Sequence, residues 1–282
     1  MAAGDIIVIS EEAGGKKGVY YDGTDDYTLV DAHAVARVGA NDTVGTYSAW
    51  IYVDNITGTY TIISTGDNDS ATEYWELFVE AGKLGTIMYH GGAQQFVVKE
   101  TTGSIPAKTW THVAIVQNGT RPDLYVNGKI VAMTSSVTTD LTYWYDELTG
   151  CDKFAIGVLE SNNTHTLDFK GAIGQVKYWS VALQANEILA DYEGTLADLE
   201  RATILDAVLQ LNITMNTDGI TDSGLGADDG ALTGDAYYGG LISNFSYTMA
   251  ANVTGDAGEE IAIIQDGSKY VGIIKGVDAG EA

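Results

Sequence analysis

Cysteine is almost absent from this chain of 282 residues, and Cys151 is the only one. No intrachain disulfide can therefore form. We expect Cys151 to be a small buried residue rather than a reactive thiol. One cysteine and four histidines are also too few for a zinc site of the usual kind.

Basic residues are scarce as well, with 14 Lys and Arg against 39 Asp and Glu and a net charge of −25. A surface this acidic repels phosphate backbones, so nucleic acid is excluded as a partner. No apolar run approaches the roughly 18–20 residues of a membrane span. The first residues lack the basic start and long apolar run of a signal peptide. We expect an extracellular or virion-surface location, no membrane span and no visible leader.

Residues 110–132 carry the clearest structural signal. Apolar and polar residues alternate over 112–116 and 124–126, which is typical of half-buried strands. The connection 118–123 is rich in turn-forming residues, and Asn127-Gly128 suits a type I′ hairpin because both positions tolerate positive φ. The stretch therefore predicts an antiparallel meander.

The same residues resemble a known family. Trp110, the strand that begins His112-Val113-Ala114, and the run 124–129 are similar to the LamG-like (laminin G type) jelly rolls of the concanavalin A-like lectin/glucanase superfamily. Residues 18–27, 47–53 and 60–66 resemble the family's earlier strands, and 169–179 its closing strand, followed by a short helix at 182–188. The resemblance covers residues 18–194. It implies an all-β fold, an antiparallel β-sandwich jelly roll.

Three regions are expected along the chain: an N-terminal strand or arm at 1–17, the LamG-like jelly roll at 18–194, and a helix with a small β tail at 195–282. Leucines recur near helical spacing over 196–211, which predicts the helix. Residues 19–98 are expected as successive strands, as are 5–10, 241–249 and 260–274. Loops are expected at 134–151 and 216–240. We assign the tail to docking or oligomerisation.

A catalytic role is excluded by the spacing of the carboxylates. The resemblance implies a Glu-x-Asp-x-x-Glu strand in relatives that cleave β-glucans, and the nearest stretch here is Glu73-Tyr74-Trp75-Glu76. Glu73 and Glu76, three residues apart on a strand, point to opposite faces and cannot flank one glycosidic bond. No nucleophile elbow or phosphate loop is present. We predict no catalytic residues and no enzyme.

The aromatic residues offer a candidate for glycan binding. Four of the five tryptophans occupy family strand positions and are expected in the core: Trp50, Trp75, Trp110 and Trp179. The fifth lies in the predicted loop, within Tyr143-Trp144-Tyr145-Asp146. This cluster could be a carbohydrate-binding platform, a subunit interface or a loop covering the end of the core.

No cofactor or metal is predicted, although calcium is an open alternative. Asp22, Asp25 and Asp26 lie in one expected turn and could supply oxygen ligands. The resemblance implies Ile-Asp-Glu-Val beside the closing strand of calcium-binding relatives, where this chain has Ile173-Gly174-Gln175-Val176. The acidic pair of that site is missing.

Asparagine is concentrated in N-x-[ST] triplets, the acceptor sequence for N-glycosylation. Eight of the twelve asparagines begin such a triplet: Asn41, Asn55, Asn68, Asn118, Asn162, Asn212, Asn244 and Asn252. Either the chain is simply rich in Asn and Thr, or it is a glycosylated exterior protein.

Together these features favour a non-enzymatic exterior structural or adhesion protein, such as a virion decoration or fibre component. Its lectin-like sandwich would contact cell-surface glycans or neighbouring subunits. The alternative is a secreted carbohydrate-binding module, calcium-dependent or not. A homo-oligomer or a surface assembly partner is expected in the first case, and a monomer with sugar affinity in the second.

Overall fold

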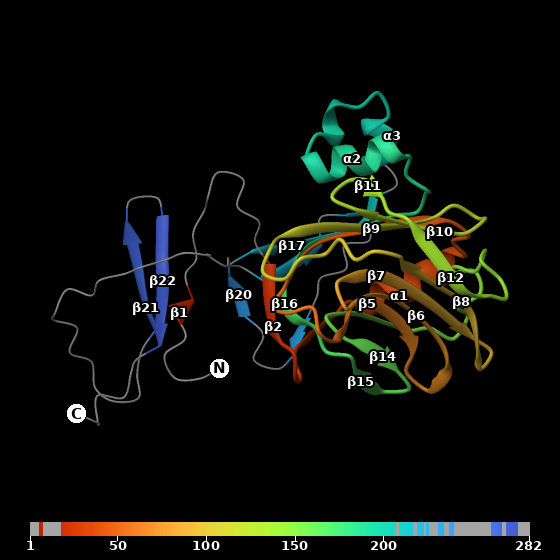
Figure 1. Ribbon diagram of the computed structural model, residues 1–282, viewed down its shortest axis with the longest axis horizontal. Coiled ribbons are helices and arrows are strands. Elements are labelled where there is room, and N and C mark those ends of the chain that lie inside the picture. Colours follow the sequence, from red (N-terminus) through yellow and green to blue (C-terminus); the bar gives the residue numbers. More distant parts are fainter. Residues whose placement is uncertain are drawn as a thin grey trace.

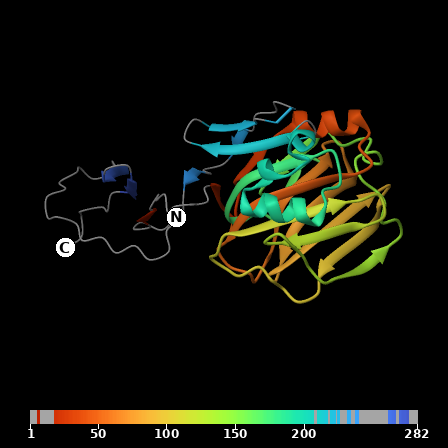
Figure 2. The ribbon, with the colours of Figure 1, turned by 90° about the horizontal axis from the view of Figure 1, so that it is seen from above.

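Two antiparallel sheets packed face to face form most of the protein, as the ribbon shows from two directions (Figures 1 and 2). The structure is a computed structural model, and it describes residues 6–7, 18–206, 209–216, 219–222, 224–225, 231–233, 237–239, 261–266 and 269–275. The predicted fold class, an antiparallel β-sandwich, is confirmed.

The first sheet has nine strands. Seven of them follow the order β11-β10-β9-β4-β16-β17-β18; in addition, β2 pairs with β16, and β20 pairs with β2. One edge of β16 pairs with β4, and the other pairs with β2 along its first half and with β17 along its second. The strands are β2 (Gly18–Asp22), β4 (Gly45–Val53), β9 (Thr111–Gln117), β10 (Pro122–Val126), β11 (Lys129–Ile130), β16 (Lys170–Trp179), β17 (Leu209–Asn216), β18 (Gly219–Asp222) and β20 (Tyr237–Gly239).

The second sheet has eight strands in the order β12-β8-β7-β6-β5-β13-β3-β19. They are β3 (Tyr27–Leu29), β5 (Thr59–Asp67), β6 (Ser70–Glu80), β7 (Lys83–His90), β8 (Ala93–Glu100), β12 (Met133–Thr138), β13 (Lys153–Ile156) and β19 (Ala231–Thr233). A separate hairpin, β14 (Leu159–Ser161) with β15 (Thr164–Thr166), lies beside β5 and β6. A three-stranded sheet joins β1 (Ile6–Ile7), β22 (Lys269–Lys275) and β21 (Ile261–Asp266).

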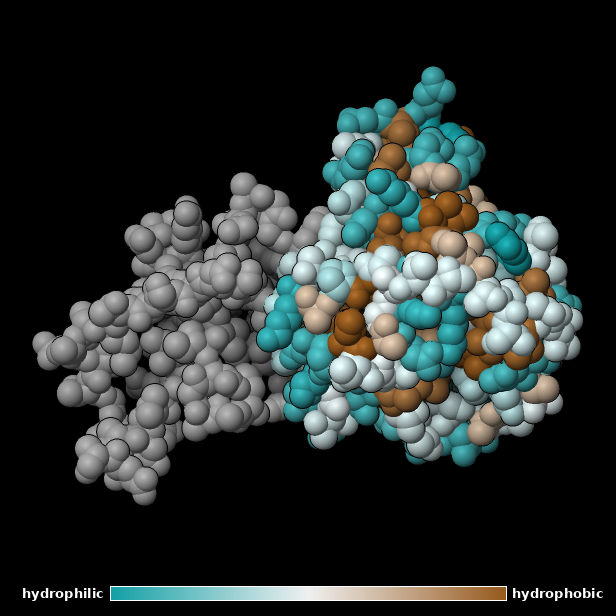
Figure 3. Space-filling model, in the orientation of Figure 1, coloured by the Kyte–Doolittle hydropathy of each residue, from teal (hydrophilic) through white to brown (hydrophobic). Residues whose placement is uncertain are grey.

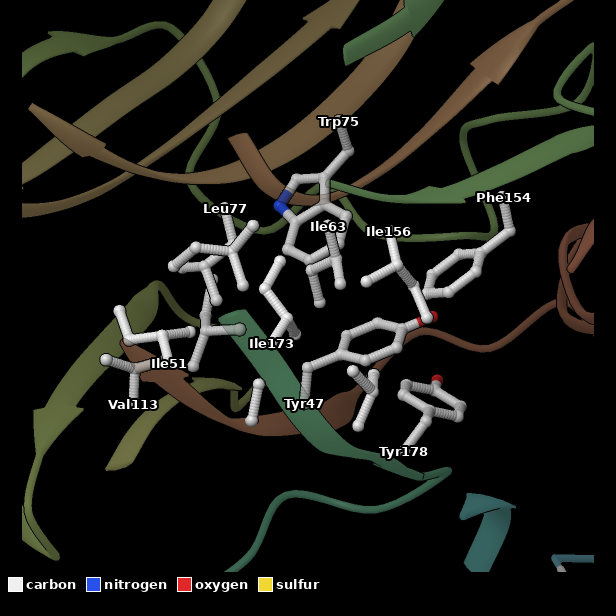
Figure 4. Packing of buried hydrophobic residues seen from close by; sticks show 14 of the residues in the cluster. Tyr47, Ile51, Ile63, Trp75, Leu77, Val113, Phe154, Ile156, Ile173 and Tyr178 are labelled. Atoms are coloured by element: carbon white, nitrogen blue, oxygen red, sulfur yellow. The ribbon is translucent and has the colours of Figure 1, made fainter. Parts of the chain in front are cut away.

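The core lies between the two large sheets, where alternate residues of each strand point inward. Trp75, Leu77, Ile63, Phe154 and Ile156 come from the eight-stranded sheet. They meet Tyr47, Ile51, Val113, Ile173 and Tyr178 of the nine-stranded sheet (Figure 4). This continuous apolar layer holds the sandwich together.

Four short helical segments accompany the sheets: α1 (Asp31–Ala40), α2 (Ala185–Glu193), η1 (Leu196–Asp198) and α3 (Ala202–Asp206). Helix α2 begins with a capping box between Gln184 and Glu187 and ends at Gly194 in the left-handed conformation. Ile188 of α2, Leu183 and Leu205 pack on Ala114 and other apolar residues on the outer face of the nine-stranded sheet. In Figure 1, α2 and α3 stand above β9 and β11. Among the described residues, no helix has the length and apolar character needed to cross a membrane.

A buried ionic cluster ties α2 to the sheet beneath it. The Asp191 carboxylate accepts hydrogen bonds from Ser48 Oγ at 2.6 Å and from Lys177 Nζ at 2.6 Å, and it pairs with His112 Nε2 at 3.0 Å. Burial alone raises the pKa of Asp191, but the bond from His112 and the charge of Lys177 outweigh it. The pKa is therefore held well below its usual range.

Several predicted elements are confirmed. The meander β9-β10-β11 is present, and Asn127 (φ 48°) and Gly128 (φ 75°) form its tight turn with positive φ at both positions. Within the run 19–98 that was expected as successive strands, β6 and β7 pair as a hairpin. The run 5–10 includes β1, which pairs with the distant β22, and 260–274 forms the hairpin β21-β22. The strand expected at 241–249 lies outside the described residues.

Other predictions are wrong. Residues 31–40 form helix α1, which buries His33, Ala34 and Arg37 on one face. Residues 134–138 of the first expected loop belong to strand β12, which pairs along the edge of β8. In the second expected loop, 219–222, 231–233 and 237–239 are strands. An unpaired sheet edge leaves backbone groups without partners, and these segments satisfy them.

The helix expected at 196–211 and the domain boundary at 195 are also corrected. The helical part ends by Asp206, and β17 follows by pairing with β16, where Leu211 lies opposite Tyr178. Strands β19 and β20 pair with β3 and β2. Segments from both sides of residue 195 therefore build the same two sheets.

Candidate functional site

The loop predicted as a carbohydrate platform is largely part of the core. Trp144 and Tyr145 are each only 1% exposed. The Trp144 ring packs 5.0 Å from the Trp75 ring, centroid to centroid, and its Nε1 donates to the Tyr178 hydroxyl at 3.3 Å. A sugar stacks only on an accessible ring face. The platform role of Trp144 and Tyr145 is therefore wrong, and the alternative of a loop closing the core matches the structure.

The other two residues of that loop retain accessible surface. Tyr143 is half-buried, and its ring contacts His90 edge to face with the centroids 5.4 Å apart. Asp146 is also half-buried, and burial followed by the nearby Glu147 charge raises its pKa. A part for Tyr143 and Asp146 in glycan binding stays a prediction.

A different aromatic group lies on the outer face of the nine-stranded sheet. In the view of Figure 3, hydrophobic residues form separate patches among hydrophilic ones. Tyr20 of β2 and Tyr52 of β4 lie opposite Ala172 of β16, one on each side. Trp110 precedes β9, with its ring centroid 5.8 Å from that of Tyr52. We call Tyr20, Tyr52 and Trp110 the aromatic row.

The aromatic row is accessible although it belongs to strands of the core. All three rings are half-buried, whereas Ala172 between the tyrosines is fully buried. Further along the same face, Tyr192 of α2 stacks on Trp50 with the centroids 5.6 Å apart. Helix α2 thus covers Trp50 but leaves the aromatic row uncovered. Trp110, which was predicted in the core, is therefore a surface residue, while Trp50, Trp75 and Trp179 are buried as predicted.

Polar groups border the aromatic row on one side. Tyr20 donates its hydroxyl proton to Asp54 Oδ2 at 2.5 Å. Lys170 lies opposite Asp22 in the β16-β2 pair, and its carbonyl accepts the Asp54 backbone N–H at 3.0 Å. Burial, reinforced by the Asp54 charge, raises the pKa of Tyr52, so its hydroxyl stays protonated at neutral pH. Flat rings beside hydrogen-bonding groups are the arrangement that pyranose recognition requires.

The aspartates named as a calcium alternative do come together. Oxygens of Asp22, Asp25 and Asp26 lie within 4.8 Å of one another. Asp26 Oδ2 accepts the Asp22 backbone N–H at 2.9 Å, and Asp22 Oδ1 accepts that of Thr24 at 2.8 Å. The carboxylates are therefore oriented by the turn itself. Oxygen donors of this kind suit a hard cation such as calcium.

Glu73 and Glu76, the carboxylates nearest to the glucanase pattern, have separate hydrogen-bond partners. Glu73 Oε2 accepts the Gly150 N–H at 2.9 Å, and its other oxygen lies 3.4 Å from His90 Nδ1. Glu76 Oε2 accepts the Thr61 hydroxyl proton at 2.8 Å, and the residue is 6% exposed. The two carboxylates thus belong to different local networks.

Glu76 should make stability depend on pH. Burial raises its pKa to about 7, against the weaker opposing effects of the Thr61 hydrogen bond and the Lys99 charge. The folded state therefore holds a proton that the unfolded state releases near pH 4.5. The contribution is fully present below pH 4.5 and is lost as pH rises to about 7. We expect the unfolding free energy of the wild type, relative to Glu76→Gln, to fall by on the order of 3 kcal/mol over this window.

Urea unfolding of both proteins at pH 4.5, 6 and 8 measures this difference. The other titrating groups occur in both proteins, so their contributions cancel in the difference between the two unfolding free energies. A difference that stays constant across the range would show that Glu76 titrates normally.

The histidines and the cysteine occupy structural positions. His112 is buried against Asp191, as expected for a core histidine, and His33 is buried with its Nε2 2.7 Å from the Tyr47 hydroxyl. His165 pairs with Glu160. Cys151 is buried as predicted, and burial raises the pKa of its thiol well above the usual range.

Six of the eight predicted glycosylation asparagines fall in the described residues. Asn41, Asn118 and Asn162 are exposed, whereas Asn55, Asn68 and Asn212 are half-buried. Asn244 and Asn252 lie outside the described residues. Modification stays a prediction, and accessibility favours the first three positions as acceptors.

The chain matches the model of a known protein family. The model of the concanavalin A-like lectin/glucanases superfamily matches residues 22–189, which is more than half of the chain. Comparison with curated proteins gave no match.

Solved structures show the same fold at low sequence identity. A candidate carbohydrate-binding protein from Bacteroides ovatus is 18% identical, with a TM-score of 0.53 over 81% of this chain and 61% of the other. The CBM40 of the Ruminococcus gnavus IT-sialidase, bound to α2,3-sialyllactose, is 16% identical, with a TM-score of 0.51 over 67% of this chain and 96% of the other. The NanB sialidase of Streptococcus pneumoniae is 14% identical, with a TM-score of 0.51 over 62% of this chain but only 27% of the sialidase.

The family match agrees with the LamG-like resemblance over 18–194 and with the two-sheet architecture. The chain belongs to the concanavalin A-like lectin/glucanase superfamily.

Proposed function

We propose that the protein is a non-enzymatic, exterior glycan-binding module that holds a sugar on the aromatic row. The observation that carries this proposal is the accessible set of Tyr20, Tyr52 and Trp110 beside Asp54. The apolar C–H face of a pyranose can stack on these rings. The Asp54 carboxylate and the tyrosine hydroxyls can exchange hydrogen bonds with the sugar hydroxyls.

The solved relatives support this assignment. Two of them are described as carbohydrate-binding units, and they share this chain's fold. The NanB sialidase is an enzyme, but the likeness covers only 27% of that chain. The separate networks of Glu73 and Glu76 favour binding without catalysis.

Trp110→Ala should weaken glycan binding by about tenfold or more, because it removes the largest stacking surface of the row. A glycan array with the intact protein identifies ligands, and titration calorimetry of wild type and variant then measures the change. The matched control is Tyr143→Ala. Tyr143 lies at the opposite end of β9, where Gln117 Nε2 donates to its carbonyl oxygen at 3.0 Å. Retained affinity in Trp110→Ala together with loss in Tyr143→Ala would move the site to the predicted loop. An array without any bound glycan would overturn the proposal.

The assembly role, as a virion decoration or fibre component, stays a second hypothesis. Its basis in the structure is that the two ends of the chain share one small sheet, through the β1-β22 pair. Exposed edges of such a sheet can pair with another chain. Light scattering tests this role, since a stable trimer or pentamer would favour assembly and a monomer would favour the module alone.

A further inference from the structure

Resting on the proposed function, we infer that the aromatic row selects uncharged glycans and rejects anionic ones that carry sialic acid, uronate or sulfate. The inference follows from the cations and carboxylates around the row. It sets this chain apart from its structural relative, whose ligand, α2,3-sialyllactose, carries a carboxylate.

Recognition of an anionic sugar depends on a cation, and arginine is best suited because its guanidinium binds a carboxylate through two parallel hydrogen bonds. The chain has three arginines, all within the described residues, and each pairs with a carboxylate of the chain. Arg37 lies 3.3 Å from Asp42, Arg121 3.1 Å from Asp123, and Arg201 2.7 Å from Glu187. All three guanidinium groups are therefore already engaged.

The three arginines also lie away from the aromatic row. Arg37 is on α1 with its side chain 10% exposed. Arg121 directly precedes Pro122, which pairs with Gln117 at the end of β9. Trp110 directly precedes the start of β9, so the seven residues of the strand separate the two by roughly 20 Å. Arg201 pairs with Glu187 in the first turn of α2, whereas Tyr192, which faces Trp50, is in the last turn.

The lysines near the row do not reverse this charge balance. Lys170 is exposed, but the strand register places Asp22 on one side of it and the Asp54 backbone on the other. Lys108 is exposed two residues before Trp110. Among the described residues, these two ammonium groups stand against five carboxylates: Asp22, Asp25, Asp26, Asp54 and Asp168.

The net charge of the whole chain adds to the negative potential around the row. With a net charge of −25, the protein repels anionic ligands before they reach the row. Like charges brought together at a binding surface are a common means of rejecting the wrong partner. An uncharged pyranose meets no such barrier, and the carboxylates can accept hydrogen bonds from its hydroxyls. Neutral hexose-based glycans therefore fit the site, and their charged derivatives do not.

Matched pairs of glycans test the inference. The array should contain neutral oligosaccharides, lactose among them, each beside its sialylated, sulfated or uronate-bearing derivative. We expect binding of neutral members and at least about tenfold weaker binding of their anionic partners. The difference in affinity between neutral and anionic glycans should shrink in 1 M NaCl, because at this salt concentration charge repulsion is screened beyond about 3 Å. It should also shrink in Asp54→Asn, which keeps the acceptor for Tyr20 and removes one charge.

The outcomes distinguish a wrong ligand class from a wrong glycan-binding role. If an anionic glycan binds as tightly as its neutral partner and Trp110→Ala abolishes both, the ligand class is wrong and the glycan-binding role stands. If discrimination is strong but unaffected by salt and by Asp54→Asn, charge does not cause it and the inference fails. If the intact protein binds no member of any pair, both proposals fail.

Discussion

Trp144→Ala is expected to lower the free energy of unfolding by about 3–5 kcal/mol, the usual cost of deleting a large buried aromatic side chain. Trp144 contacts Trp75 and Tyr47, with ring centroids 5.0 and 6.1 Å away, so the substitution leaves a cavity in the centre of the aromatic core. It also removes the donor that reaches the Tyr178 hydroxyl. Urea unfolding followed by tryptophan fluorescence measures the loss.

The control for Trp144→Ala is the adjacent Tyr143→Ala. Tyr143 is half-buried, so its removal should cost well below the loss expected at Trp144. Glycan affinity of Trp144→Ala, measured under conditions where the variant is folded, should match the wild type. Unchanged stability together with lost binding would restore Trp144 as a sugar platform and contradict the buried position described above.

Asp191→Asn should cost about 3–5 kcal/mol, because it strands the buried charge of Lys177. The Lys177 side chain is 13% exposed, and its Nζ lies 2.6 Å from Asp191 Oδ1. The His112 side chain, only 1% exposed, loses its carboxylate partner as well. Chemical unfolding at pH 7 measures the effect. Because the pKa of Asp191 is depressed in the folded state, its contribution to stability is fully present above about pH 4 and is lost only in strong acid.

Two further variants identify the cause. Glu193→Gln changes an exposed carboxylate two residues along the same helix and should alter stability by less than about 0.5 kcal/mol. The double variant Asp191→Asn/Lys177→Met removes the stranded ammonium and should recover part of the loss. No recovery would show that the carboxylate acts through packing or helix docking rather than through the ion pair.

Local sequence patterns predicted much of the sandwich. Alternation over 112–116 and 124–126 predicted β9 and β10, and Asn127-Gly128 predicted the turn after them, because period and turn chemistry depend on neighbours in the chain. The family resemblance placed β2, β4, β5 and β16 through the segments 18–27, 47–53, 60–66 and 169–179. Segments 134–138 and 209–211 were misassigned as loop and helix, because their strand state depends on distant partners, the edges of β8 and β16.

The position of the candidate binding site also depended on distant parts of the chain. Alternation places Trp110 and His112 on one face of β9, but it does not say which face is the core or what covers the other. Helix α2 from far along the chain buries His112 under Tyr192 and stops short of Trp110. The loop holding Trp144 folds inward, because the end of the sandwich must be closed against water.

By itself, the sequence determined the all-β class, the hairpins, the absence of a disulfide and the acidic charge, since each depends on composition or on adjacent residues. Only the tertiary structure decided which aromatic rings remain accessible, because exposure depends on what packs against a residue from elsewhere in the chain. Trp144 is enclosed by the core, and Trp110 is left at the surface beside Tyr52 and Asp54.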